Sequence, residues 1–426
     1  MISKKKEKLN WILTYDLRLN QTYTFRYISF LKKLIEKNNN TKAIGLIFPF
    51  NPHHIEDVSI NSSLIHRPKL IELVELTITD YNIIQRILLF IDAHQYPFWL
   101  EKSFLAIHVM IYKVDAWFVN PSNFKNIKTE PSIIISGGSG GIIKSSYLLS
   151  KKFNAKLVLD YRDPWNFGYH LLETNYLIHS LKRRFTLKTE LRILEYAHHI
   201  TTVSESLKNC FPKKYHHKIT VIENGSNFEQ EDIIYQINAK PEKFSISYLG
   251  TIYNDQLFEE DFFKAFAYFY SSTDNNSLIA LNFIGADKND SLKKLIKKYK
   301  LEKITSVTKR MSEEMLLTYL TQSSIFLQLR FKDRSQIITS KITDYLMFGK
   351  PILLPVSDKG DIAETIKKYQ AGYVCNGVED TIVVLQKEYQ KFLNKESIMI
   401  HQKDLSHLSR TQISKKLVKV IEDLQA

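Results

Sequence analysis

The sequence predicts an α/β protein made of two doubly wound domains, each built on a mostly parallel sheet. Short runs of apolar, often β-branched residues alternate with helical periods along all 426 residues. Several of these runs are apolar at most positions, which is typical of parallel strands covered on both faces. The chain is too long for one ordinary core, so its length favours two or three domains.

The expected strands form two groups. The first group comprises Trp11–Tyr15, Ala43–Phe48, Ser132–Ser136, Lys156–Asp160, Ile200–Val203 and Ile219–Ile222. The second group comprises Ser245–Leu249, Leu278–Phe283, Ile325–Leu329, Pro351–Val356 and Tyr373–Cys375. Helical periods separate the strands, at Thr24–Glu36, Thr174–Ala197, Asp261–Tyr270, Ser312–Thr321, Ser340–Phe348, Asp361–Gln370 and Asp380–Leu393.

The expected domain boundary follows Gly225. The stretch Ser226–Lys243 is polar and acidic and lacks a persistent apolar period, so we interpret it as a linker. The domains are then residues 1–228 and 229–407. A last helix near Thr411–Leu424 has no strand after it, and we expect the segment 408–426 to pack back on the first domain.

The composition narrows the class of partner. The sequence has 59 Lys+Arg against 45 Asp+Glu, a net charge of +14, which indicates a nucleic acid, an anionic membrane or a phosphorylated substrate. No helix-turn-helix, zinc-finger or RNP signature is present, so we expect no nucleic acid. Two cysteines build no disulfide framework, and adjacent histidines point apart, so we expect no metal.

Membrane contact is a peripheral one in this interpretation. The most apolar stretch, Ile83–Val119, is interrupted by charges, and no signal peptide is evident, so we expect a cytoplasmic protein. Residues 181–192 read LKRRFTLKTELR, a basic helix that suits the anionic inner face of the cytoplasmic membrane. A solvated helix face is the alternative interpretation of these residues.

Two segments of the first domain carry candidate functional residues. The turn SIIISGGSGG brings Gly137, Gly138 and Ser139 to a strand end, where they could approach a ligand or simply form a tight turn. The segment DYRDPW places Asp160, Arg162 and Asp163 at the end of another strand, where charged side chains usually face the ligand crevice. A structural ion-pair corner around the arginine is the alternative.

In the second domain, the candidates point to an anion. Gly250-Thr251 follow a buried strand, where a glycine lets a phosphate or sugar approach the backbone. Ser340, Lys341 and Asp344 open a helix whose N-terminus could bind an anion, with the lysine adding charge and the aspartate accepting from sugar hydroxyls.

Together and in this order, these segments resemble bacterial glycosyltransferases of the GT-B fold, the group 1 or family 4-like enzymes. The similarity is strongest to the subset with a DxRDPW motif, here Asp160–Trp165. Further matching segments are Thr202–Ser204, Val221–Gly225, Leu249–Thr251, Lys341–Leu346 and Gly349–Pro351. The resemblance extends from about Ser132 to the C-terminus.

The resemblance implies two Rossmann-like domains facing a central cleft, with a nucleotide-sugar donor held mainly by the second. It implies sugar transfer to a glycan or lipid-linked acceptor in cell-surface polysaccharide synthesis of the LPS, O-antigen or capsule type. Retention of the anomeric configuration, without a metal or other cofactor, is also implied. For such a transfer we expect Asp160, Arg162 and Asp163 to be the catalytic residues, with Asp160 or Asp163 as the base for the acceptor hydroxyl and Arg162 holding them or an acceptor phosphate.

The resemblance also assigns residue roles. Asp344 stands at the second Glu of the family's E-x7-E pattern and would bind ribose hydroxyls, whereas the first Glu falls at Gln336. The family's Arg and Lys after the Gly-Thr turn are absent here, so Arg310, Arg330 and Lys341 are our candidates for neutralising the diphosphate. Because the first Glu is missing, a non-catalytic partner protein stays an alternative, as does a sugar-nucleotide epimerase of the same fold.

Overall fold

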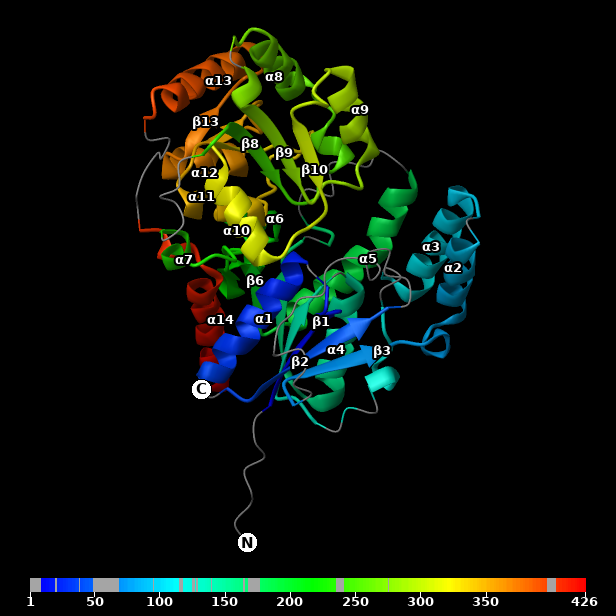
Figure 1. Cartoon of the computed structure of the whole chain (residues 1–426). Coiled ribbons are helices and arrows are strands. Elements are labelled where there is room, and N and C mark those ends of the chain that lie inside the picture. The colour runs from blue at the N-terminus through cyan, green and yellow to red at the C-terminus, as the bar shows by residue number, and fades with distance from the viewer. Residues whose placement is uncertain are drawn as a thin grey trace. The chain divides into compact units, whose positions relative to one another are not determined.

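The chain folds into two compact units (Figure 1). Unit 1 comprises Met1–Glu223 and Ile413–Ala426, and unit 2 comprises Asn224–Gln412. The computed structural model describes residues 9–19, 21–37, 39–48, 69–94, 96–114, 118–124, 127, 129–138, 140–163, 165–167, 177–234, 241–274, 276–396 and 404–426.

Unit 1 is built on a seven-stranded parallel sheet with the order β3-β2-β1-β4-β5-β6-β7. Its strands are β1 (Asn10–Tyr15), β2 (Thr41–Ile47), β3 (Ile71–Glu75), β4 (Ile133–Gly137), β5 (Lys156–Tyr161), β6 (His199–Thr202) and β7 (Ile219–Val221). The strand order reverses between β1 and β4, and doubly wound sheets bind their ligands outside the carboxyl ends of such strands.

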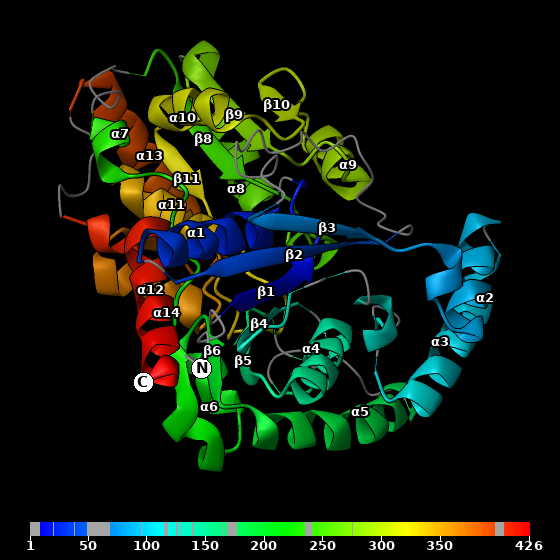
Figure 2. The same ribbon diagram turned by 90° about the horizontal axis from the view of Figure 1, so that it is seen from below.

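The helices of unit 1 cover both faces of this sheet. They are α1 (Thr22–Glu36), α2 (Ile83–Ala93), α3 (Phe98–Tyr112), α4 (Gly140–Phe153), α5 (Leu177–Tyr196), α6 (Glu205–Cys210) and most of α14 (Arg410–Gln425). Figure 2 shows α1 and α14 side by side on one face and α4 and α5 on the other. Tyr27 and Leu31 of α1 share one apolar core with Leu417 and Ile421 of α14. The C-terminal helix therefore packs on the first unit.

Unit 2 is built on a six-stranded parallel sheet with the order β10-β9-β8-β11-β12-β13. Its strands are β8 (Phe244–Leu249), β9 (Ile279–Ile284), β10 (Thr305–Thr308), β11 (Ile325–Leu327), β12 (Ile352–Leu354) and β13 (Gly372–Val374). The strand order reverses between β8 and β11, so a ligand site is expected at their carboxyl ends.

The helices of unit 2 bury apolar side chains on both faces of the sheet. They are α7 (Gln230–Ile234), α8 (Asp261–Ser271), α9 (Asp290–Lys298), α10 (Glu313–Gln322), α11 (Ser340–Phe348), α12 (Asp361–Tyr369) and α13 (Val378–Leu393). One core includes Leu353 of β12, and a second core includes Ile352 and Leu354 of the same strand. This two-sided burial explains why the central strands β11 and β12 are apolar at every position.

The prediction that Ser226–Lys243 forms a linker is wrong for the first residues of this stretch. Ser226 pairs with Ser409 in a parallel bridge, and Phe228 and Ile233 are buried in a core of unit 2. Two apolar anchors within a polar stretch are enough to fold it onto the unit, although they produce no helical or strand period. The remaining residues 235–240 of the expected linker lie outside the described residues.

No helix in the described part of the chain is both long and apolar enough to cross a bilayer.

Candidate functional site

The candidate site of unit 2 lies at the carboxyl edge of its sheet, which two glycines line. Gly250 follows β8 with φ +86°, and Gly285 follows β9 with φ +85°, a backbone region that L side chains rarely adopt. A Cβ atom added to Gly250 would meet nothing nearer than the Lys341 side chain, at 4.0 Å. The backbone in front of Gly250 is therefore accessible to a ligand that lies against Lys341.

Two cations lie at this edge. Lys341 Nζ donates to the Tyr248 hydroxyl (2.5 Å), lies 3.8 Å from the centre of the Tyr248 ring, and is 3.5 Å from the Thr251 carbonyl oxygen. Arg310 Nη2 donates to the Thr251 hydroxyl at 2.9 Å. Burial and repulsion by Arg310 lower the pKa of Lys341 to about 7. An anion placed here would stabilise the protonated lysine.

The N-terminus of α11 adds backbone donors to the same edge. Ser340 is the first helical residue, and Thr339, the N-cap, makes no capping hydrogen bond. The Thr339 hydroxyl is buried and finds no partner among the described residues. A helix of nine residues presents its first N–H groups there, where partial positive charge favours an anion.

Arg330, predicted to neutralise the diphosphate, is already paired with a carboxylate. Its guanidinium makes a two-pronged ion pair with Glu259, with Nε donating to Oε2 at 2.7 Å and Nη2 bonding Oε1. Phe258 packs against the same guanidinium, 5.3 Å from Cζ to the ring centre. Because Glu259 already balances its charge, Arg330 is a poor candidate for neutralising a diphosphate.

Asp344 also differs from its predicted role. It is 5% exposed, and its Oδ1 accepts from the Ser226 hydroxyl (2.7 Å) and from the Asn227 backbone N–H (3.1 Å). Burial raises the pKa of Asp344, whereas Arg410 and these two hydrogen bonds oppose the rise. The carboxylate thus fastens the Ser226–Asn227 segment onto α11, and this geometry does not support ribose binding.

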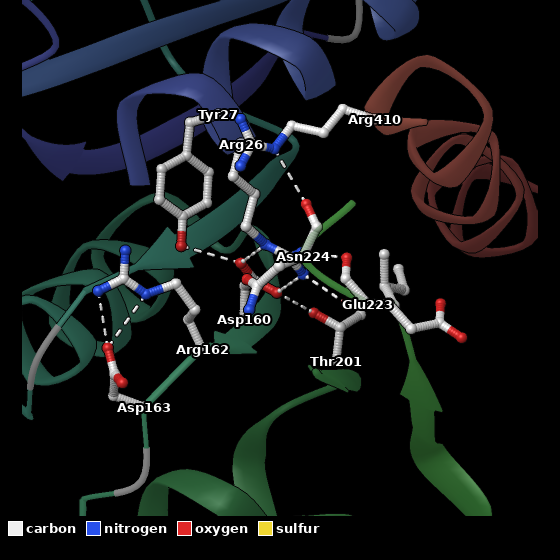
Figure 3. Close-up of polar contacts among 10 residues, drawn as sticks. Arg26, Tyr27, Asp160, Arg162, Asp163, Thr201, Glu223, Asn224 and Arg410 are labelled. Carbon is white, nitrogen blue, oxygen red and sulfur yellow. Dashed lines mark hydrogen bonds and ion pairs between the residues drawn. The ribbon is translucent and has the colours of Figure 1, made fainter. Parts of the chain in front are cut away.

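In unit 1, Asp160 is the centre of a buried polar network (Figure 3). It is 1% exposed, and Arg26 of α1 donates to both of its oxygens, at 2.9 and 2.8 Å. The hydroxyls of Tyr27 (2.8 Å) and Thr201 (2.6 Å) donate to the same carboxylate. Burial alone would raise the pKa of Asp160, but Arg26 and these hydrogen bonds hold it below its usual value. Because both oxygens of Asp160 already accept hydrogen bonds, the geometry favours a structural role for this carboxylate over a role as a catalytic base.

Arg26 extends the network to the end of the unit. Its Nη2 donates to the Ile222 carbonyl oxygen at 3.0 Å and its Nη1 to the Glu223 carbonyl oxygen at 2.7 Å. Glu223 also forms an ion pair with Lys416 of α14 at 2.6 Å. One buried arginine therefore ties α1, β5 and the segment after β7 together, a role that the sequence alone did not reveal.

The other two candidate residues of this segment, Arg162 and Asp163, remain accessible. Arg162 donates to Asp163 Oδ2 from Nε (3.1 Å) and Nη2 (2.7 Å), and the Asp163 side chain is 55% exposed. Arg162 also lies 5.9 Å from the ring centre of Tyr23 on α1. This pair follows β5 at the carboxyl edge of the sheet, where a substrate would reach it.

A second charged pair follows β1 at the same edge, and the sequence analysis missed it. Arg18 donates to both oxygens of Asp16, with Nε and Nη2 at 3.0 and 2.9 Å from their nearest oxygens. The Tyr23 hydroxyl donates to the Asp16 carbonyl oxygen at 3.1 Å. The rule that drew attention to Asp160, a charged residue at the carboxyl end of a buried strand, applies equally to Asp16, which directly follows β1.

The glycine-rich turn is explained by packing. A Cβ atom on Gly137 would lie 2.1 Å from Cζ of Tyr27, and one on Gly138 would lie 2.7 Å from Cδ1 of Ile142. Gly140 opens α4 against the indole of Trp165, which a Cβ would meet at 2.3 Å. These contacts favour the tight-turn interpretation for Gly137 and Gly138, and Ser139 lies outside the described residues.

Helix α5 holds the segment after Asp163 in place through hydrogen bonds to Asn166. Glu190 Oε2 accepts from the Asn166 backbone N–H at 2.9 Å, and the Thr186 hydroxyl donates to Asn166 Oδ1 at 2.7 Å. Burial raises the pKa of Glu190 to about 7, although hydrogen bonds from Asn166 and Tyr161 oppose the rise. This support positions the segment that carries Arg162 and Asp163.

Among the described residues, no group of three or more His, Cys, Asp or Glu side chains could hold a metal ion.

Two Rossmann-like units, each with polar residues at the carboxyl edge of a parallel sheet, define the GT-B type of fold. Residues 230–407, which lie within unit 2, match the family described as Glycosyl transferases group 1. No curated protein matches the sequence.

Solved structures of this fold resemble the chain over nearly its whole length. Sucrose-phosphate synthase from Thermosynechococcus elongatus superimposes with a TM-score of 0.59 at 12% identity, covering 98% of this chain and 99% of that chain. A glycosyltransferase from Rickettsia africae ESF-5 gives a TM-score of 0.57 at 14% identity, with the same coverage. UDP-GlcNAc 2-epimerase from Methanocaldococcus jannaschii gives 0.52 at 12% identity, again covering 98% and 99%. At such identities the likeness establishes the fold alone.

Proposed function

We propose that the protein is a glycosyltransferase that moves a sugar from a nucleotide-sugar donor to a glycan or lipid-linked acceptor. One observation carries the proposal: the cluster of Lys341, Arg310 and two positive-φ glycines at the carboxyl edge of a group 1 glycosyltransferase domain. A structure of S. aureus MnaA with UDP, similar to this chain at a TM-score of 0.52 and 11% identity, is consistent with a nucleotide donor.

The chemistry of transfer explains why such a cluster is needed. The anomeric C–O bond to the diphosphate breaks, a C–O bond to the acceptor hydroxyl forms, and the hydroxyl proton is lost. Negative charge develops on the departing diphosphate, and a preorganised donor at such a site contributes about 3 kcal/mol to transition-state stabilisation. Lys341 and Arg310 supply cationic donors, and Gly250 and the first turn of α11 supply backbone N–H groups.

The acceptor side is assigned to unit 1. Asp163 is the candidate base because it is exposed, and Arg162 holds the carboxylate or contacts an acceptor phosphate. The resemblance carried by Asp160–Trp165 to the DxRDPW subset, retention of the anomeric configuration, and a place in cell-surface polysaccharide synthesis are further parts of this proposal.

The basic face of residues 181–192 belongs to the proposal as a contact with an anionic membrane. Arg183, Arg184, Lys188 and Arg192 are exposed on α5. The acidic residue among them, Glu190, is buried. Such a face suits the inner surface of the cytoplasmic membrane, where lipid-linked acceptors are found.

The test begins with donor binding. UDP-, GDP-, dTDP- and ADP-sugars are titrated by calorimetry into wild type, Lys341→Met and Arg310→Gln, with Lys294→Ala on the exposed surface of α9 as matched control. We expect one nucleotide class to bind wild type and the control equally, and each site variant at least about tenfold more weakly. Equal binding by all four proteins would refute the site.

The products then separate the function classes. Transfer of labelled sugar to a glycan or lipid acceptor, followed by NMR of the anomeric proton, supports the transferase and gives its stereochemistry. Interconversion of the nucleotide sugar without an acceptor would indicate an epimerase. Tight binding without turnover on a panel of acceptors would indicate a non-catalytic partner protein.

A further inference from the structure

A helical hairpin of unit 1 exposes an unusual amount of apolar surface. Fifteen large hydrophobic side chains are exposed in the described structure, and eight of them fall within Ile78–Ile111. These eight are Ile78, Ile83, Phe90, Tyr96, Trp99, Ile107, Met110 and Ile111. The other seven all lie in unit 2, so among the described residues of unit 1 the exposed large hydrophobic side chains all lie in α2 and α3 or in the short segments next to them.

On α3 these side chains form one stripe. Trp99 (67% exposed), Ser103, Ile107 (42%) and Met110 (54%) follow one another at helical spacing. The Ser103 hydroxyl donates to the Trp99 carbonyl oxygen at 2.8 Å, so the polar member of the stripe is already satisfied. From Ser103 to Tyr112 the helix contains no Asp, Glu, Lys or Arg. Such a helix face gains free energy by leaving water.

The hairpin is rigid on its inner side. Asn82 caps α2 by accepting from the Ile84 and Gln85 N–H groups, both at 3.0 Å. His108 of α3 is buried, contacts Asn82 at 3.2 Å, and is held against the Val114 carbonyl at 3.2 Å. The exposed apolar stripe is therefore part of a folded element rather than a frayed end.

The long helix that packs against this hairpin is basic. Helix α3 packs against α5, and both Figure 1 and Figure 2 show the hairpin at one end of unit 1 beside the long α5. The exposed cations of α5 are Arg183, Arg184, Lys188 and Arg192. Apolar and aromatic side chains next to a row of cations are what an anionic lipid bilayer recognises, since the chains enter the interface while the cations bind headgroups.

We propose that α2 and α3 form an insertion hairpin that enters the interface of an anionic phospholipid bilayer through Trp99, Ile107 and Met110. The cations of α5 bind the headgroups beside it. This inference rests on the membrane contact proposed above for residues 181–192, and adds the element that enters the lipid. It requires no catalytic residue and no particular donor.

The experiment compares three variants with wild type on vesicles. The hairpin variant is Trp99→Ser/Ile107→Ser/Met110→Ser, and the basic variant is Arg183→Gln/Arg184→Gln/Lys188→Gln. The matched control replaces three equally exposed apolar residues of unit 2, Tyr268→Ser/Met315→Ser/Val383→Ser. Partitioning is measured by co-sedimentation with phosphatidylcholine vesicles, with and without phosphatidylglycerol, at physiological salt. Thermal unfolding of each protein checks that it is folded.

We expect wild type and control to bind the anionic vesicles equally, and the hairpin variant to bind about tenfold more weakly or worse. The basic variant should lose the salt-dependent part of binding. Fluorescence adds a direct readout, because brominated lipids should quench the tryptophan emission of wild type but not that of Trp99→Phe.

Three results would overturn the proposal. Absence of wild-type binding to any vesicle would remove both the hairpin and the basic face. Unchanged binding by the hairpin variant would leave the basic face alone. A dimer by light scattering that the hairpin variant dissociates, without vesicle binding, would assign the stripe to a second copy of this chain. Donor titrations of the same proteins keep the outcomes separate, since vesicle binding without nucleotide-sugar binding would refute the proposed enzyme and leave the hairpin standing.

Discussion

Donor binding should depend on pH through Lys341, because burial and Arg310 lower its pKa to about 7. A diphosphate binds the protonated lysine. Between pH 6 and pH 8 the protonated fraction falls from about 0.9 to about 0.1. The affinity for a nucleotide sugar, whose diphosphate keeps its charge over this range, should therefore fall about tenfold, or about 1.4 kcal/mol.

Proton uptake provides a second measure of the same event. Binding an anion raises the pKa of Lys341, and at pH 7 about half of the lysines are still deprotonated before binding. Each donor bound should then take up about half a proton. Calorimetric titrations at pH 7 in two buffers that differ in ionisation enthalpy give this number directly from the difference in observed heat.

The variant Lys341→Arg isolates the residue. A guanidinium keeps its charge across this range, so the affinity of the variant should be nearly independent of pH and its proton uptake close to zero. Lys350, whose pKa burial also lowers to about 7, is present in both proteins, so its titration cancels in the comparison. A flat profile in wild type, or the same slope in both proteins, would refute the reasoning.

Four further predictions follow from the contacts of unit 1. Arg26→Met leaves the buried carboxylate of Asp160 without its cation and should reduce the free energy of unfolding, measured by urea denaturation, by about 3 to 5 kcal/mol. Asp163→Asn should leave the free energy of unfolding unchanged and lower kcat by about a hundredfold. Gly137→Ala places a methyl group 2.1 Å from Tyr27 and should cost about 1 to 3 kcal/mol of stability, and a cost near zero would show that the turn yields. The pKa of Glu190 is raised to about 7 from an ordinary value of 4.5, so its contribution to stability is fully present below about pH 4.5 and is lost as the pH rises through 7. The free energy of unfolding should fall by about 3 kcal/mol over this range. Denaturation series at several pH values should show this fall in wild type but not in Glu190→Gln.

The strands that the sequence analysis missed share one property. β3 and β10 are edge strands of their sheets, and most of their residues are only partly buried. An edge strand covered incompletely needs no continuous apolar run, so Thr305–Thr308 reads as a polar turn. The central strands, which are buried on both faces, were predictable for the opposite reason.

The donor-side residues divide in a similar way. Gly250, Thr251, Arg310 and Lys341 were predicted near one another, and the structure brings them together at one sheet edge. For Gly250, Thr251 and Lys341 the position follows from a local rule, since they were read from the end of a strand or the start of a helix. Arg310 was chosen instead as a substitute for the cations that the family resemblance implies and this sequence lacks.

The roles of Arg330 and Asp344 depended on partners far away in the sequence. Glu259 lies 71 residues before Arg330, and Ser226 lies 118 residues before Asp344. No spacing or local pattern marks either pair, because a long-range ion pair or hydrogen bond is selected by the folded geometry alone. A charged residue at a helix start or strand end is therefore a candidate whose partners must be known before its role is.

The DxRDPW-like segment contains one buried and one exposed carboxylate, and the two have different roles. Asp160 points into unit 1, where Arg26, Tyr27 and Thr201 occupy its oxygens. Strand β5 ends one residue later, at Tyr161, and the turn that follows carries Arg162 and brings the Asp163 side chain to the surface. The buried carboxylate fixes the end of β5, and that fixed end sets where the exposed pair is presented. The position of the exposed Arg162–Asp163 pair thus depends on the buried Asp160, so the candidate site needs both halves of the motif.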